Sequence, residues 1–150
     1  MKNKGFTLIE LLAVIVILAI IALIATPTIL GVVEDARKGA AESSILGWID
    51  AVEKQGMINE LDESTTNDLV DGTYNVTATG IKSTADGAAD IAVNVKGQRP
   101  DVSGSQSFTI SSGQITGTPV FKLGKYYVTY TASTGKATAA TTAPASTEEP

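Results

Sequence analysis

The sequence has no cysteine and no histidine among its 150 residues. Without thiols the folded part cannot form disulfides, so packing and hydrogen bonds must hold it together. The same absence removes thiolate and imidazole from any catalytic or metal-binding scheme. The spacing of the Ser and Lys residues does not indicate a hydrolase either. We therefore expect no enzyme activity, no cofactor and no metal site.

Basic residues are also scarce. The chain has 11 Lys and Arg against 16 Asp and Glu, a formal net charge of −5. A protein that binds nucleic acid needs clustered Lys and Arg to neutralise phosphates, and here they are scattered. We expect no nucleic acid as a specific ligand.

What the chain does have is a long apolar run near its N-terminus. No residue from Leu11 to Val33 carries a charge, and about 20 apolar residues in a helix cross a bilayer. Lys2 and Lys4 precede the run, and Glu34 and Asp35 follow it. The positive-inside rule then places the N-terminus in the cytoplasm and the rest of the chain outside. The sequence predicts a protein that crosses the membrane once.

A secretory signal peptide and a plain membrane anchor are the alternatives. The run is longer than a usual signal-peptide core, and no small-x-small cleavage site follows it. A plain anchor leaves Glu10 unexplained, because a carboxylate at the centre of a membrane helix costs ~2.5–3.5 kcal/mol, and less near an end. Cleavage after Gly5 would give Phe6 a free α-amine about one helical turn from Glu10. That amine could pair with the Glu10 carboxylate of its own chain or of a neighbour.

Residues 4–10, with the sequence Lys-Gly-Phe-Thr-Leu-Ile-Glu, resemble the processing site of type IV prepilins. The stretch up to Pro27 is similar to the N-terminal helix of that family. The resemblance implies that a prepilin peptidase cleaves between Gly5 and Phe6 and N-methylates Phe6. It also implies that Glu10 is the carboxylate used in assembly.

The same resemblance implies a function and partners. The chain is expected to be the structural subunit of a type IV pilus, a homopolymer that serves adhesion, motility or DNA uptake. Its partners would be the prepilin peptidase, the pilus assembly platform and the motor ATPase. The protein would lie in the membrane before assembly and in an extracellular filament afterwards.

Two alternatives stay open beside the pilus. A pseudopilin of a type II secretion or competence machine shares the same N-terminus, and an adhesin on a membrane anchor would also need such a helix. The lack of cysteine differs from the many pilins that close a C-terminal loop with a disulfide. It resembles pilins of a Gram-positive type.

Pro27 interrupts the apolar run, and Gly31 follows one turn later. Proline removes a backbone donor and crowds the preceding turn, so we expect a helix kink at these two residues. The alternative is that the helix ends near Thr26, the residue before the proline.

Helical periodicity resumes after the proline and predicts an amphipathic segment at residues 29–56, with Gly56 as its end. Its apolar face includes Ile45, Trp48 and Val52, and Trp48 is expected in the core. The predicted fold class is α+β, with a long N-terminal α-helix packed on a C-terminal antiparallel β-sheet.

We divide the chain into six segments: a leader at 1–5, a transmembrane and assembly helix half at 6–28, the amphipathic half at 29–56, an acidic connection at 57–71, a β-rich region at 72–136 and a low-complexity tail at 137–150. The β-rich region is expected to hold four to six short strands, because alternating apolar residues are punctuated there by glycine turns. Three acids in its loops, Asp86, Asp90 and Asp101, are calcium ligand candidates, although solvated turn acids explain them equally well.

Overall fold

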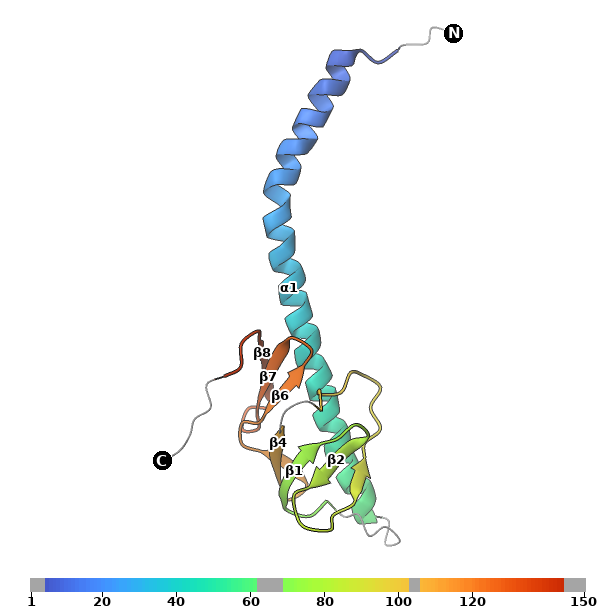
Figure 1. Ribbon diagram of the computed structural model, residues 1–150, viewed down its shortest axis with the longest axis vertical. Coiled ribbons are helices and arrows are strands. Elements are labelled where there is room, and N and C mark those ends of the chain that lie inside the picture. The colour runs from blue at the N-terminus through green and yellow to red at the C-terminus, as the bar shows by residue number, and fades with distance from the viewer. Residues whose placement is uncertain (1–4, 62–68, 103–105, 145–150) are drawn as a thin grey trace. The chain divides into compact units, whose positions relative to one another are not determined.

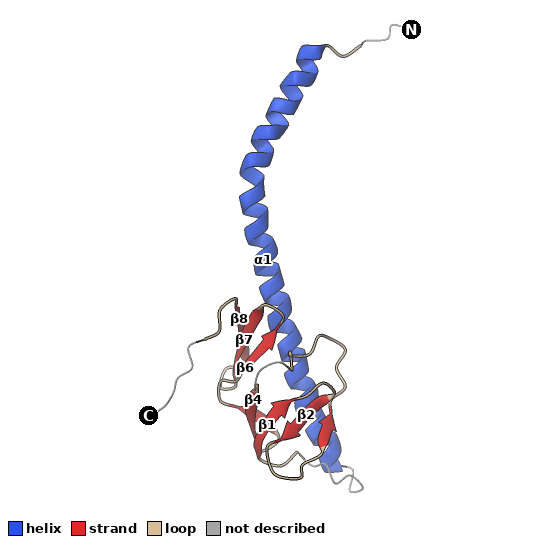
Figure 2. Ribbon diagram, in the orientation of Figure 1, coloured by secondary structure: helices blue, strands red, loops and turns tan. Residues whose placement is uncertain are grey.

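The computed structural model describes residues 5–61, 69–102 and 106–144 (Figure 1). These residues form one long helix followed by eight strands. They are α1 (Leu8–Leu61), β1 (Gly72–Val76), β2 (Gly80–Ser83), β3 (Asp90–Ala92), β4 (Ser107–Ser111), β5 (Gln114–Thr116), β6 (Val120–Leu123), β7 (Tyr126–Thr131) and β8 (Lys136–Ala140). The α+β class predicted from the sequence is confirmed (Figure 2).

The chain divides into two compact units, Met1–Arg37 and Lys38–Pro150. Within the described residues, the first unit contains only the N-terminal part of α1 and the three residues before it. Its large apolar side chains are exposed, from Phe6 at 88% to Val33 at 40%. Within the described chain, α1 alone is long and apolar enough to cross a membrane. The membrane helix predicted from the sequence therefore has the length and the apolar surface that it needs.

Pro27 lies inside α1, and the residues on both sides of it are helical. The alternative that the helix ends near Thr26 is therefore wrong. Proline has no N–H, so the carbonyl of Leu23 lacks its usual helical donor at this point. One residue earlier in the chain, the Thr26 hydroxyl donates to the carbonyl oxygen of Ala22 at 2.7 Å. The kink itself stays a prediction.

The second unit contains the C-terminal part of α1 and two antiparallel sheets. One sheet has five strands in the order β3-β2-β1-β4-β5, and the other has three in the order β6-β7-β8. The two sheets lie along the same helix, with β6–β8 nearer its middle and β1–β3 nearer its C-terminal end (Figure 1). Both sheets alternate buried and open positions, as in β7, where Tyr126, Val128 and Tyr130 are buried.

Trp48 joins the two sheets in one core. Its side chain is fully buried, with ring centroids 5.5 Å from Phe108 in β4 and 5.1 Å from Phe121 in β6, both edge-on. Ile45 and Val52, on the same helix face, are also fully buried. The predicted apolar face and the core position of Trp48 are confirmed. Because aromatic side chains bury about 150–250 Å² each, this cluster can hold a domain without disulfides.

Two boundaries in the second unit differ from the prediction. Gly56 does not end the helix, which continues to Leu61. This glycine serves close packing instead, since a Cβ there would lie 3.1 Å from Cδ1 of Leu69. Residues 57–61 of the predicted acidic connection are therefore helical, and residues 62–68 lie outside the described residues.

The predicted low-complexity tail is also wrong over its first residues. Residues 137–140 belong to β8, which pairs with β7, and Ala139 is buried. Small residues leave room there for the Glu42 carboxylate of α1 to reach the N–H of Ala139, a tertiary effect that composition does not reveal. Residues 145–150 of that predicted tail lie outside the described residues.

Tyr74 and Tyr130 are expected to make the stability of the domain depend on pH. Its ring is buried and its hydroxyl donates to the carbonyl oxygen of Val70 at 2.8 Å. Burial, with a further contribution from the charge of Asp71, raises the pKa of Tyr74 above its ordinary value. Burial, with the charges of Glu53 and Asp50, does the same to the pKa of Tyr130.

We expect the free energy of unfolding to fall as the pH rises above about 10, because the unfolded tyrosines ionise before the folded ones. Below that pH both groups are protonated in both states, so this contribution is fully present. Tyr74→Phe should flatten the fall, and adding Tyr130→Phe should flatten it further. Denaturant titrations of the full chain in detergent between pH 8 and 11 measure this. Equal slopes in all three proteins would contradict the assignment.

Candidate processing and assembly site

The helix α1 begins with a reciprocal set of hydrogen bonds between Thr7 and Glu10. The Glu10 carboxylate oxygen Oε2 accepts from the main-chain N–H and from the hydroxyl of Thr7, each at 2.8 Å. In return, Oγ1 of Thr7 accepts from the N–H of Glu10 at 3.3 Å. This is a capping box, in which the residue before the helix and the third helical residue satisfy each other's free N–H groups. The first helical bond follows, from the N–H of Leu11 to the carbonyl oxygen of Thr7 at 3.2 Å.

This arrangement gives the Glu10 carboxylate a partner within its own chain. Two donors and the positive end of the helix dipole stabilise the negative charge, so its insertion near the end of a membrane segment costs less. The partner predicted from the sequence is a free amine alone, and the prediction misses Thr7. The signal was present, because Thr followed three residues later by Glu is the sequence pattern of a capping box.

Gly5 and Phe6 lie just before the capping box, outside the helix. Neither has regular secondary structure, and the Phe6 side chain is 88% exposed. A Cβ added to Gly5 would meet no atom within 4 Å. The predicted cleavage point is therefore an open backbone segment that directly precedes the helix carrying Glu10.

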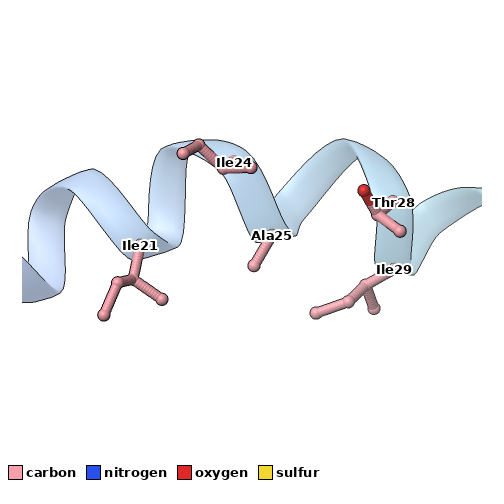
Figure 3. Close-up of a pocket in the computed structure, with 5 residues that line it drawn as sticks. All are labelled: Ile21, Ile24, Ala25, Thr28 and Ile29. Carbon is pink, nitrogen blue, oxygen red and sulfur yellow. The ribbon is translucent and has the colours of Figure 1, made fainter.

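Pro27 and Gly31 lie several turns further along α1, away from this site. Near them the helix has a shallow apolar hollow lined by Ile21, Ile24, Ala25, Thr28 and Ile29 (Figure 3). Figure 3 shows Ile21, Ala25 and Ile29 projecting from the same side, so the small alanine lies between two larger side chains. Such a gap can receive a side chain of another helix.

The three acids considered for calcium do not form a site among the described residues, where no group of three metal-ligating side chains occurs. Asp101 has a structural role instead. Its Oδ2 accepts from the N–H of Gly124 at 3.0 Å, and its own N–H donates to the carbonyl oxygen of Lys122 at 2.7 Å. Asp101 therefore fastens the loop before β4 to strand β6.

Comparison with known families bears on the N-terminal segment. The family model described as the prokaryotic N-terminal methylation motif matches residues 1–26. This motif is the signature of type IV pilins and pseudopilins, so the recognition made from residues 4–10 is confirmed. Proteins with this signature are structural rather than enzymatic, and they are processed and assembled by dedicated machinery. The searches of curated proteins and of solved structures found no match.

The signature and the helix agree with each other physically. The matched residues include the exposed segment with Gly5 and Phe6, the capping box and most of the apolar part of α1. An apolar helix with this exposure and this motif fits insertion into a membrane before assembly.

Proposed function

We propose that this protein is the structural subunit of a type IV pilus. It is made as a prepilin, cleaved between Gly5 and Phe6, methylated on Phe6 and polymerised through α1. The observation that carries this proposal is the methylation motif at the start of a helix whose large apolar side chains are exposed. The core of the second unit supports it further, since this core needs none of the apolar residues before Ala41.

Assembly moves the apolar helix from lipid to a bundle of other helices. Lipid is as apolar as such a bundle, so burial of apolar surface alone hardly favours assembly. Close packing must contribute, and the hollow at Ala25 between Ile21 and Ile29 supplies a place for a neighbour's side chain. Extraction of the helix from lipid would cost tens of kcal/mol at ~25 cal/mol per Å², which explains the need for a motor ATPase.

Glu10 provides the polar interaction that favours pairing between subunits. A carboxylate can accept about four hydrogen bonds, so the two donors of Thr7 leave capacity for another. After cleavage, the α-amine of Phe6 in an adjoining subunit can donate a further hydrogen bond to the Glu10 carboxylate. Each amine that enters the bundle then has a carboxylate partner, which a buried charge requires.

The exposed strand positions favour a pilus over the short filament of a pseudopilin. Thr73 and Thr109 are cross-strand partners on the open face of the larger sheet, and Thr138 is exposed on the smaller one. Hydroxyl-rich faces suit a long surface in contact with water. The pseudopilin of a type II secretion or competence machine remains the second candidate, because it shares the N-terminal motif.

Mass spectrometry of sheared surface material tests the processing step. We expect a chain that begins with N-methylated Phe6, and Gly5→Val should leave the uncleaved precursor in the membrane. The β-branched valine restricts the backbone at the cleavage point, which glycine leaves free. A mature chain that begins at Met1 would contradict the proposal, as would one that begins after Ala25.

Electron microscopy of the same sheared material separates the two candidates. Long filaments that contain this chain, and that disappear when its gene is deleted, establish the pilus. Processed chain that stays with the envelope without long filaments would favour the pseudopilin.

A further inference from the structure

Each sheet of the second unit has one edge strand that is hydrogen-bonded to α1. In the five-stranded sheet this edge strand is β5, and in the three-stranded sheet it is β8. An edge strand presents unpaired N–H and C=O groups, to which a strand of another chain can add. Proteins that crowd many copies together need to cover such edges.

Two glutamates of α1 each accept from one outward N–H group of these strands. The N–H of Ile115, at the centre of β5, donates to Oε1 of Glu53 at 3.2 Å. The N–H of Ala139 in β8 donates to Oε1 of Glu42 at 2.8 Å. In both cases a carboxylate of the helix occupies the position that the carbonyl of a further strand would need.

The spacing of the two glutamates places both of them on one face of α1. Glu42 and Glu53 are three helical turns apart, which puts them on the same side of α1 at about 16 Å along the axis. Both side chains are half-buried, and the fully buried Ile45 and Trp48 lie between them in sequence. The same face that supplies the core thus also covers both sheet edges.

The hydrogen bonds to Glu42 and Glu53 are strong enough to keep the two N–H groups occupied. A hydrogen bond to a charged acceptor is about twice as strong as a neutral one, and less water competes for it at a half-buried position. A carboxylate accepts only, so it binds the strand's N–H group and repels the carbonyl of an incoming strand. Alanine at either position would leave a free N–H on an open edge.

We propose that Glu42 and Glu53 close the β8 and β5 edges against the addition of a strand from a second copy of this chain. The need for such closure rests on the proposed polymerisation, which packs copies side by side. The closure itself depends only on the contacts within one chain, so it can be tested without filaments.

Hydrogen exchange of the full-length chain in detergent micelles, followed by NMR, tests the two contacts one at a time. In Glu42→Ala the amide of Ala139 should exchange about tenfold to a hundredfold faster, while that of Ile115 keeps its rate. Glu53→Ala should give the reverse pattern. Glu42→Gln and Glu53→Gln keep an acceptor oxygen and should retain most of the protection. Asp50→Ala, at an exposed acid of the same helix, controls for the loss of one charge and should leave both rates unchanged.

Self-association tests the consequence. The double variant Glu42→Ala/Glu53→Ala should form dimers or larger species joined by intermolecular strands, seen by sedimentation and by infrared spectroscopy of mixed isotope-labelled chains. The double variant Glu42→Gln/Glu53→Gln should show the same association state as the wild type. Unchanged exchange of Ala139 and Ile115 in the Ala variants would overturn the proposal. A monomeric Ala double variant with both amides unprotected would also overturn it, because open edges would then not add strands.

Discussion

Glu10→Val is expected to lower the yield of sheared filaments at least tenfold relative to the amount of processed subunit, while membrane insertion and leader cleavage continue. Valine is cheaper than a carboxylate in lipid, so insertion is preserved or eased. Without the carboxylate, however, each Phe6 amine would enter an apolar bundle with no partner, which costs several kcal/mol. The factor of ten corresponds to only about 1.4 kcal/mol, so it is a lower bound.

Thr7 provides the matched control for this experiment. Thr7→Val has nearly the same shape but removes the hydroxyl that donates to Oε2 of Glu10 at 2.8 Å. The negative charge and the main-chain donor at Thr7 both stay. We therefore expect a decrease in filament yield much smaller than that of Glu10→Val. Glu10→Asp should be intermediate, because its shorter side chain keeps the charge but loses reach.

The outcome separates two roles of Glu10. If Glu10→Val gives normal filaments, the carboxylate serves only to begin the helix and the assembly mechanism must be abandoned. If Thr7→Val and Glu10→Val reduce filaments equally, the capping box and not the intersubunit pair is the essential element. Both results are read from the ratio of sheared to total processed subunit on immunoblots.

What the sequence predicted well is local or periodic. The apolar run, the basic residues before it and the short motif at residues 4–10 sufficed to predict a helix long and apolar enough to cross a membrane and the N-terminal methylation motif. The core face around Trp48 followed from helical spacing alone. The alternation of apolar and polar residues also predicted the β-rich region, although the structure has eight strands and not the expected four to six.

What the sequence did not reveal depends on contacts between distant residues. Gly56 looks like a helix end by composition, yet its role is to let Leu69 approach α1. Strand β8 has small residues with little strand preference, and its place is fixed by β7 and by Glu42. Strand β2 begins at Gly80, a residue type that is typical of turns. Its place in the strand depends on the pairing with β3.

Gly80 is therefore the best position for a test of the fold. A Cβ added there would overlap the carbonyl oxygen of Ile91 and lie 2.7 Å from the backbone nitrogen of Val93. These are backbone atoms, so no side-chain rotation can relieve the contact. The surroundings are also held in place, because the Arg99 guanidinium donates to the carbonyl oxygens of Ala78 and Val93, each at 2.9 Å.

We expect Gly80→Ala to lower the free energy of unfolding by about 3 kcal/mol or more, since overpacking of side chains alone costs roughly 1–3 kcal/mol. Gly72→Ala is the matched control, because Gly72 also opens a strand and its added Cβ would meet nothing within 4 Å. There the substitution should be neutral or stabilise by roughly 0.5 kcal/mol, since alanine restricts the unfolded chain more than glycine does. Denaturant titrations of both full-length variants in the same detergent measure the difference. Equal stabilities of the two variants would show that β2 and β3 do not approach each other this closely. The arrangement of these two strands at the edge of the larger sheet would then be wrong.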